Sequence, residues 1–239
     1  MITNTLRKIK RFAKIAIGRE YYTSLDIKIR NVKLGSKHCG WNVAVDYLKN
    51  DLTVLSFGLG EDISFDFVLA DQYKSIVHGF DPTPRSIAWV KSQELPNSFK
   101  LHEYGLADFN GSIEFYPPEN PDHISYTTVN RPASVSSSTD SINVPVKTIT
   151  TIMNDLQLKR IDILKMDIEG SEYGVLNDLL VTDIRPQQLL VEFHHRFPEI
   201  GMAKTKNIIY QLRNEGYRIF SISENAEEYS FIYDPHKSL

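Results

Sequence analysis

The most informative ionisable side chains of this sequence come directly after one short apolar run. Asp167 follows the run I-L-K-M at 163–166, and Glu169 and Glu172 come within the next few positions. Buried strands of open α/β sheets carry functional acids at their carboxyl ends, where such sheets bind ligands. We therefore expect Asp167 on the rim of an active site that Glu169 helps to shape. Lys165 is expected to neutralise a buried acid, and Glu172 to stabilise the start of the following helix.

A second group of candidate catalytic residues lies at the end of the next apolar run, 188–195. Alternation along a strand places Glu192 and His194 on one face and His195 on the other. An imidazole of ordinary pKa accepts a proton at neutral pH, which favours His194 as the general base and His195 second. Two alternatives stay open. In the first, a divalent ion such as Mg²⁺ or Mn²⁺ is bound by Asp167, Glu192 and His194 and acidifies the acceptor. In the second, the histidines only shape an acceptor pocket.

A glycine-containing loop follows an earlier apolar run, in the sequence V-L-S-F-G-L-G-E-D. Gly58 and Gly60 allow the backbone to approach a ligand closely. A dinucleotide fingerprint needs a third glycine where this chain has Ile63. Glu61 and Asp62 would repel a pyrophosphate at a helix N-terminus, which normally attracts anions. Acidic neighbours favour instead the ammonium and sulfonium of S-adenosylmethionine, so we expect this cofactor rather than NAD.

Two further acids follow the next predicted strands along the chain. Asp81 comes directly after the second strand, where an acid accepts hydrogen bonds from ribose hydroxyls. Asp108 comes after the third strand and is placed to accept from an adenine amino group. Each acid has an alternative role as an ordinary turn residue, which Asp often fills.

Short apolar runs alternate with helical patterns, which predicts βαβ units and a mostly parallel sheet. Strands are predicted at 53–57, 75–80, 99–103, 162–166, 188–193, 218–223 and 229–233, and helices at 64–70, from Pro84, and at 149–156, 171–180 and 203–214. A local antiparallel element with its turn at Gly111 and a second strand at 112–116 is also expected, and 142–146 is expected to be extended. The last two strands form a hairpin, because only a short polar loop joins them. We therefore predict an α/β, Rossmann-like class I methyltransferase fold: a mostly parallel seven-stranded sheet with a C-terminal antiparallel hairpin and helices on both faces.

Four blocks of this sequence together resemble the FkbM family of S-adenosylmethionine-dependent methyltransferases. The blocks are VLSFGLGEDISFD at 54–66, GFDPTP at 79–84, GLADFNGSIEFY at 105–116 and ILKMDIEGSEY at 163–173. The last block is the most specific, since it matches the family pattern K-x-D-x-E-G-x-E. The resemblance covers roughly residues 50–235.

The resemblance implies an O-methyltransferase acting on a hydroxyl of a sugar, glycan or related metabolite, as in the assembly of surface polysaccharides or natural products. It implies that Gly58 and Gly60 line the methionine part of S-adenosylmethionine. It also implies that Asp81 holds the ribose, Asp108 the adenine, and that Asp167 lies near the transferring methyl.

This chain departs from the wider methyltransferase pattern in its first strand. Many methyltransferases have an acid there, where this chain has Ser56. Glu61 or Asp62 is expected to take over the contact with the cofactor's ammonium.

Composition limits the remaining possibilities. The chain has 239 residues, of which 41% are hydrophobic and 24% charged, and its net charge is −3. This is the composition of a globular protein, without the basic balance of a nucleic-acid-binding domain. Its single cysteine, Cys39, excludes an intramolecular disulfide. The lack of a membrane-spanning apolar stretch and of a signal peptide predicts a cytoplasmic location.

The predicted organisation is an N-terminal helical or extended extension over 1–45 and a methyltransferase domain over 46–239. Apolar and basic residues alternate at helical spacing over 5–19. This segment packs on its own domain, or lies on the inner face of a membrane. The Pro- and Ser-rich segment 117–141 is expected to be a lid over the acceptor site. Competing functions are an NAD(P)-dependent oxidoreductase and a non-catalytic binding module of the same fold.

Overall fold

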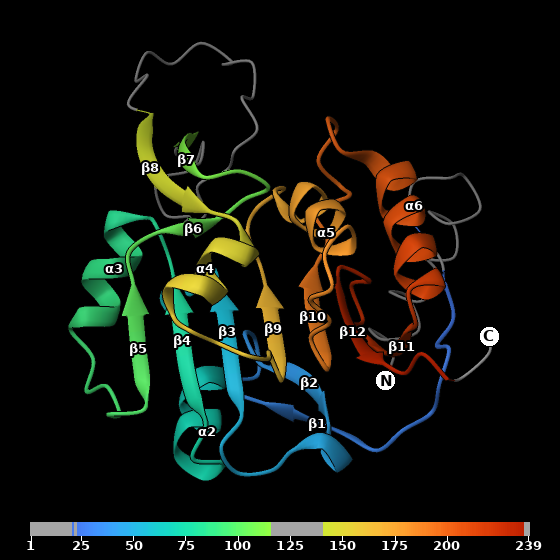
Figure 1. Cartoon of the computed structure of the whole chain (residues 1–239), viewed down its shortest axis with the longest axis horizontal. Coiled ribbons are helices and arrows are strands. Elements are labelled where there is room, and N and C mark those ends of the chain that lie inside the picture. The colour runs from blue at the N-terminus through green and yellow to red at the C-terminus, as the bar shows by residue number, and fades with distance from the viewer. Residues whose placement is uncertain (1–20, 22, 116–140, 237–239) are drawn as a thin grey trace, which may run out of the picture.

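The computed structural model describes residues 21, 23–115 and 141–236, and its central element is a seven-stranded sheet (Figure 1). Its strands are β3 (Thr53–Phe57), β4 (Ile76–Phe80), β5 (Phe99–His102), β9 (Ile163–Met166), β10 (Gln188–Glu192), β11 (Tyr217–Ile222) and β12 (Glu228–Tyr233). The strand order is β11-β12-β10-β9-β3-β4-β5. The five neighbouring strands β10, β9, β3, β4 and β5 are parallel to one another, whereas β12 is antiparallel to both β10 and β11. The predicted class I methyltransferase fold is thereby confirmed.

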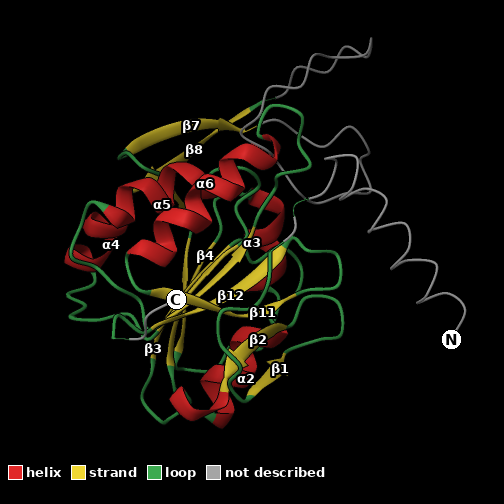
Figure 2. Ribbon diagram, turned by 90° about the vertical axis from the view of Figure 1, so that its right-hand side faces the viewer, coloured by secondary structure: helices red, strands yellow, loops and turns green. Residues whose placement is uncertain are grey.

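Helices cover both faces of the sheet (Figure 2). They are α2 (Ser64–Gln72), α3 (Pro84–Lys91), α4 (Ile149–Asp155), α5 (Glu172–Leu180) and α6 (Gly201–Asn214). Helices α4, α5 and α6 pack on the face that carries Leu164 and Val191, and α2 and α3 pack on the face that carries Ile163 and Leu190. Side chains alternate between the faces of a strand, so both faces of these central strands are apolar and buried.

A two-stranded hairpin, β1 (Asn31–Leu34) and β2 (Trp41–Ala44), lies on the same face as α2. Leu34 and Trp41 join the core around Phe65, and the short 3-10 helix η1 (Val45–Tyr47) leads on to β3. The described part of the predicted extension is therefore packed on the domain. The helix expected over 5–19, and all but the last residue of the lid expected over 117–141, lie outside the described residues.

A separate three-stranded sheet lies above the carboxyl edge of the main sheet (Figure 1). It consists of β6 (Gly105–Leu106), β7 (Gly111–Phe115) and β8 (Ile142–Lys147) in the order β6-β8-β7. The expected turn at Gly111 is wrong, because Gly111 begins β7, which pairs antiparallel with β8 rather than with the segment before it. Strand β8 lies between β6 and β7 and pairs with both, and its alternate residues Val144 and Val146 are buried.

Among the described residues, no helix combines the length and apolar character needed to cross a membrane.

Candidate active site

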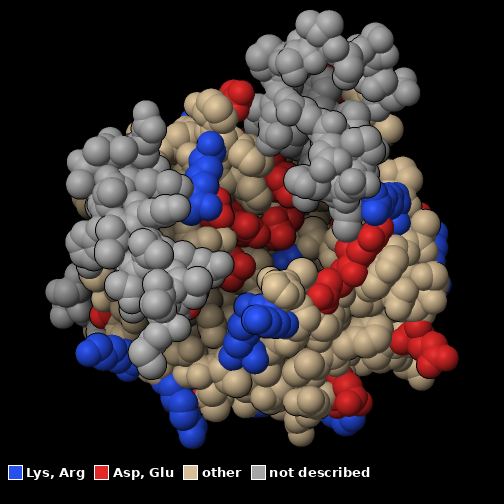
Figure 3. All heavy atoms as spheres, turned by 180° about the vertical axis from the view of Figure 1, so that it is seen from behind, with Lys and Arg blue, Asp and Glu red and all other residues tan. Residues whose placement is uncertain are grey.

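A cavity of about 550 Å³ opens at the carboxyl edge of β3, β4 and β9. Acidic side chains gather in a hollow on the face shown in Figure 3. The acidic residues that line the cavity are Glu61, Asp62, Asp66, Asp81, Asp167, Glu169, Glu192 and Glu228. Lys165 is the one Lys or Arg in the described lining. A cavity with this excess of carboxylates attracts a cationic ligand.

Asp81 fixes the glycine loop that forms one wall of the cavity. Its Oδ2 accepts hydrogen bonds from the backbone N–H groups of Leu59 at 3.0 Å and Gly60 at 3.1 Å. Its Oδ1 accepts from the backbone N–H of Thr83 at 2.9 Å and from the Thr83 hydroxyl. A carboxylate has about four acceptor positions, so Asp81 is fully used within the protein. A ribose hydroxyl would therefore have to replace the Thr83 hydroxyl.

Glu61 and Asp62 are both held by neighbouring groups at the start of α2. Glu61 accepts a hydrogen bond from Arg85 Nε at 2.7 Å, and Asp62 accepts one from the backbone N–H of Ser64 at 2.9 Å. Burial acts to raise the pKa of Asp62, but hydrogen bonds from Ser64, Ser36 and Cys39 outweigh it and lower the pKa below its usual value. Asp62 is therefore an ionised structural acceptor.

The tight turn after β9 is organised by Glu172. This side chain is fully buried and accepts hydrogen bonds from the backbone N–H groups of Ile168 and Gly170, each at 3.1 Å. Within the turn, Glu169 has φ 52° and Gly170 has φ 108°, values in the left-handed region. Only glycine adopts that region without strain, which explains Gly170. Glu172 was expected only to stabilise its helix, yet it also sets the backbone that presents Asp167 and Glu169.

His194 lies between Glu172 and the two carboxylates of the turn. Its Nδ1 is 2.9 Å from Glu172 Oε1, and its Nε2 is 3.4 Å from Glu169 Oε2 and 3.8 Å from Asp167 Oδ1. Burial acts to lower the pKa of His194, but Glu172, Glu169 and Asp167 outweigh burial and raise the pKa to about 10. His194 is then a cation at neutral pH and a hydrogen-bond donor to Glu172.

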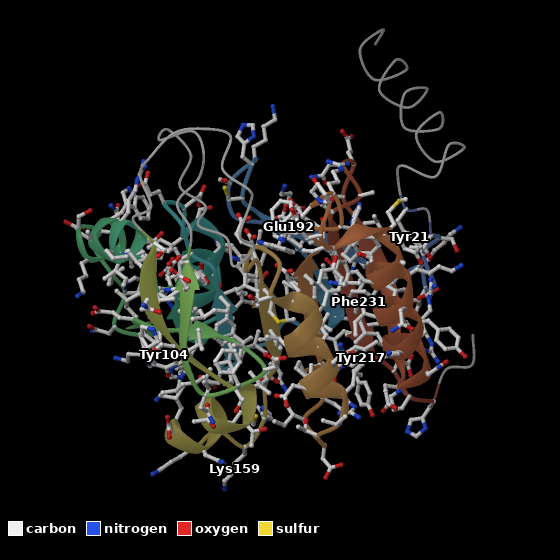
Figure 4. The ribbon with its side chains drawn as sticks, turned by 90° about the horizontal axis from the view of Figure 1, so that it is seen from above. Tyr21, Tyr104, Lys159, Glu192, Tyr217 and Phe231 are labelled. Carbon is white, nitrogen blue, oxygen red and sulfur yellow. The ribbon has the colours of Figure 1, made fainter. Side chains whose placement is uncertain are left out.

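Glu192 ends β10 beside Asp167, as predicted from the order of the strands. Figure 4 shows Glu192 near the middle of the molecule, viewed onto the carboxyl edge of the sheet. One donor atom each from Asp167, Glu192 and His194 lie within 4.8 Å of one another. Burial, followed by the charge of Asp167, raises the pKa of Glu192 well above its usual value. These three residues form the second end of the candidate site.

Three predicted site residues are not among those that line the cavity. His194 does not line the cavity itself, but its Nε2 lies 3.8 Å from Asp167 and 3.4 Å from Glu169, which do. His195 is buried, with 3% of its surface exposed, and is not a member of the donor group formed by Asp167, Glu192 and His194. Asp108 is exposed. The role of Asp108 in binding adenine and the role of His195 as a base remain predictions.

Several lining residues were not found from the sequence. They are His38, Cys39 and Trp41 from the β1–β2 hairpin, Asp66 from α2 and Glu228 from β12. Asp66 did give a signal, since it is an acid between Phe65 and Phe67 on a helix whose neighbouring residues are apolar. The hairpin residues gave none, because their place at the cavity depends on long-range packing.

An open parallel sheet, closed by an antiparallel hairpin and bearing an acid-lined cavity at its carboxyl edge, defines a protein of the class I methyltransferase type. Residues 44–219 match the methyltransferase FkbM domain, and the chain belongs to this family.

Several known proteins are similar to this chain. Probable methyltransferase-like protein 24 of Rattus norvegicus is 26% identical over 175 residues, which cover 69% of this chain and 41% of that protein. The Homo sapiens protein of the same name is 25% identical over 191 residues, or 75% and 45%. Methyltransferase 1 of Beauveria bassiana (strain ARSEF 2860) is 28% identical over 123 residues, or 44% and 49%. The chain thus spans less than half the length of these relatives.

Among solved structures, the crystal structure of M. jannaschii TYW2 in complex with AdoMet aligns with 89% of this chain and 86% of its own. The two are 10% identical, with a TM-score of 0.34.

Proposed function

We propose that this chain is an S-adenosylmethionine-dependent O-methyltransferase that acts on a hydroxyl of a sugar, glycan or related metabolite. The observation that carries the proposal is the acid-lined cavity, whose glycine-loop wall and Asp167–Glu192 end lie side by side. One wall suits the cationic cofactor, and the other end offers carboxylates to an acceptor hydroxyl. The glycan preference rests on the family resemblance.

The lining residues fit S-adenosylmethionine, which supplies a methyl group activated by a sulfonium. The cavity of about 550 Å³ is within the usual range for small-molecule sites and is large enough for S-adenosylmethionine. Gly58 and Gly60 line the part of the cavity to which we assign the methionine part of the cofactor. Asp81 binds the ribose when a ribose hydroxyl replaces that of Thr83. The carboxylates balance the positive charge of the sulfonium.

Asp167 is the residue that we assign to proton removal. S-adenosylmethionine bound here would supply its methyl group to the acceptor oxygen, and the electron pair of the broken carbon–sulfur bond would stay on sulfur. The hydroxyl proton passes to the Asp167 carboxylate, while the charged His194 holds Asp167 and Glu169 in place. Glu192, protonated because of burial and the nearby Asp167, donates a hydrogen bond that orients the acceptor.

A divalent cation is the second candidate for activating the acceptor. Donor atoms of Asp167, Glu192 and His194 lie within 4.8 Å of one another, and the two carboxylates suit Mg²⁺ or Mn²⁺. His194 would join them as a ligand only after losing its proton. Such an ion would lower the pKa of a bound hydroxyl. Activity that falls after treatment with EDTA and returns with Mn²⁺ favours this variant, whereas unchanged activity favours direct transfer to Asp167.

Isothermal titration of the full chain with S-adenosylmethionine, S-adenosylhomocysteine and NADH tests the proposal. Binding of the adenosyl ligands and not of NADH is expected. The reverse result supports the oxidoreductase alternative. Adenosyl binding without turnover on any pool of hydroxylated acceptors supports a binding module. Asp167→Asn should lower the turnover number about 10²- to 10⁴-fold, the usual contribution of a general base, with little change in cofactor affinity.

A further inference from the structure

Asp66 is a buried acid at the wall of the cavity, and one of its two carboxylate oxygens has no hydrogen-bond partner in the described part of the chain. It lies in the first turn of α2, is 3% exposed and lines the cavity. Its Oδ1 has no hydrogen-bond partner among the described residues. A buried polar atom without a partner costs about 1–3 kcal/mol, and more when the group is charged. Such an atom at a cavity wall is placed to bind a ligand.

Lys165 comes to the same side of the sheet from β9. It is 6% exposed, and its ammonium donates hydrogen bonds to the carbonyl oxygens of Phe57, at 3.1 Å, and Gly58. Trp41 lies next to it, with the ammonium 5.7 Å from the ring centroid. An ammonium has three N–H donors, so these two bonds leave a third for a ligand at the cavity.

Ser56 is the small residue that leaves room for the charged side chains of Asp66 and Lys165. It is the register partner of Lys165 in the parallel pair of β3 and β9. Both side chains therefore point to the face covered by α2 and the β1–β2 hairpin. The Ser56 hydroxyl is buried beside Asp66 and acts to lower the pKa of that carboxyl. A larger acid at this position would fill the space that Asp66 reaches from α2.

The two acids expected to contact the cofactor's ammonium are less suited to it. Glu61 is paired with Arg85 at 2.7 Å, and Asp62 accepts a hydrogen bond from Ser64. Burial raises the pKa of Asp66 to about 6, and the charge of Lys165 opposes this rise. Asp66 is thus largely ionised at neutral pH and available for a cation.

We propose that Asp66 and Lys165 form a receptor for the zwitterionic α-amino acid end of the cofactor. Asp66 binds the α-ammonium, and the remaining N–H of Lys165 binds the α-carboxylate. This inference rests on the proposed function, since it concerns the same cavity. It assigns the selection of an amino-acid-bearing nucleoside over a plain nucleoside to two residues on different elements.

The test uses four ligands on the full chain, measured by isothermal titration. They are S-adenosylhomocysteine, its analogue without the amino group, its analogue without the carboxyl group, and 5′-methylthioadenosine, which lacks the amino-acid end. Each is titrated into the wild type, Asp66→Asn, Lys165→Met and the control Asp71→Asn. Asp71 is an exposed acid on the same helix. Thermal unfolding verifies that each variant is folded.

Asp66→Asn is expected to weaken the binding of S-adenosylhomocysteine about 30-fold or more, the usual effect of removing one partner of a buried charge pair. The same variant should bind the analogue without the amino group as the wild type does. Lys165→Met should likewise weaken the binding of S-adenosylhomocysteine, and it should bind the analogue without the carboxyl group as the wild type does. Asp71→Asn should change no affinity.

Two results overturn the inference while leaving the proposed function intact. One is wild-type binding of S-adenosylhomocysteine that Asp66→Asn does not weaken. The other is an equal loss for S-adenosylhomocysteine and 5′-methylthioadenosine. If Lys165→Met does not fold, the wild-type affinities of the four ligands still decide the matter, because a receptor for the zwitterion must prefer the complete amino acid. Wild-type protein that binds none of the four ligands refutes the proposed function and this inference together.

Discussion

The backbone of Gly58 lies directly against the backbone of Asp167. A Cβ atom added to Gly58 would come 1.7 Å from the carbonyl oxygen of Asp167, and the φ angle of Gly58 is +77°. The backbone N–H of Asp167 in turn donates to the carbonyl oxygen of Phe57 at 3.1 Å. The glycine loop and the acidic turn after β9 are therefore one rigid unit, which joins the wall assigned to the cofactor to the acid assigned to proton removal.

Gly58→Ala should damage this unit far more than Gly60→Ala does. An added methyl group at Gly58 collides with backbone that cannot move away, so we expect a loss of about 3 kcal/mol or more in the free energy of unfolding. Gly60 has a φ angle of +56°, and a Cβ there meets nothing within 4 Å. Its substitution should cost only the conformational strain, about 1–2 kcal/mol. Urea unfolding of both variants measures the difference, and equal losses would show that the contact is not rigid.

Glu172→Gln should lower the pKa of His194. The neutral amide removes the closest of the charges that raise the pKa of His194, so this pKa should fall. Loss of hydrogen bonds from a fully buried carboxylate should also cost about 2–3 kcal/mol in the free energy of unfolding. Titration of the His194 ring by NMR, in protein dialysed against EDTA, follows the first effect. Glu199→Gln, at an exposed acid, is the control. A His194 pKa that does not move would refute the assigned role of Glu172.

Asp66 should make stability depend on pH in a way that Asp66→Asn removes. Because burial raises its pKa to about 6 from 3.8, the unfolded chain loses this proton at a lower pH than the folded protein. The folded state is therefore favoured below about pH 4, and this contribution is lost as the pH rises to about 6. The difference amounts to about 3 kcal/mol at most.

The measurement is urea unfolding of wild type and Asp66→Asn from pH 4.5 to 7.5. The variant should gain stability relative to the wild type as the pH rises, because the asparagine has no charge to bury. A difference that is constant over this range would mean that Asp66 is not a buried, ionising acid.

Much of the fold was predictable because its signals are local. The apolar runs that became β3, β4, β9 and β10 are buried on both faces, and such runs stand out in a parallel sheet. The short polar loop before β12 predicted the antiparallel hairpin. The pairing of β7 with β8 was missed, since their partnership spans a long intervening segment and depends on tertiary packing.

The candidate site was predictable where function follows the order of strands, and less so elsewhere. Asp167 and Glu192 were placed together correctly because carboxyl ends of neighbouring parallel strands share one edge. An ordinary pKa was expected for His194, but three nearby carboxylates raise this pKa and keep the ring charged. No pattern in the sequence reveals that convergence, since Asp167 and Glu169 lie in a turn, and Glu172 at the start of α5, whose relative placement is fixed only by folding.

The N-terminal segment should contribute to stability even though the family match begins at residue 44. Asp26 accepts hydrogen bonds from Arg213 of α6, at 2.9 Å from Nε and 2.7 Å from Nη2, and from the backbone N–H of Ile219 at 2.9 Å. The Asp26 side chain is 8% exposed. Asp26→Asn should therefore cost about 3 kcal/mol, because it leaves the charge of a partly buried arginine without its partner.

Asp46→Asn is the matched control for this prediction. Asp46 pairs with Arg30 at 2.6 Å, but their side chains are 58% and 71% exposed. An exposed pair of this kind contributes about 0–1 kcal/mol, so the control should unfold almost as the wild type does. Urea unfolding of the two variants side by side gives the comparison. If Asp26→Asn is no more harmful than Asp46→Asn, the segment before β1 is an appendage rather than part of the folded domain.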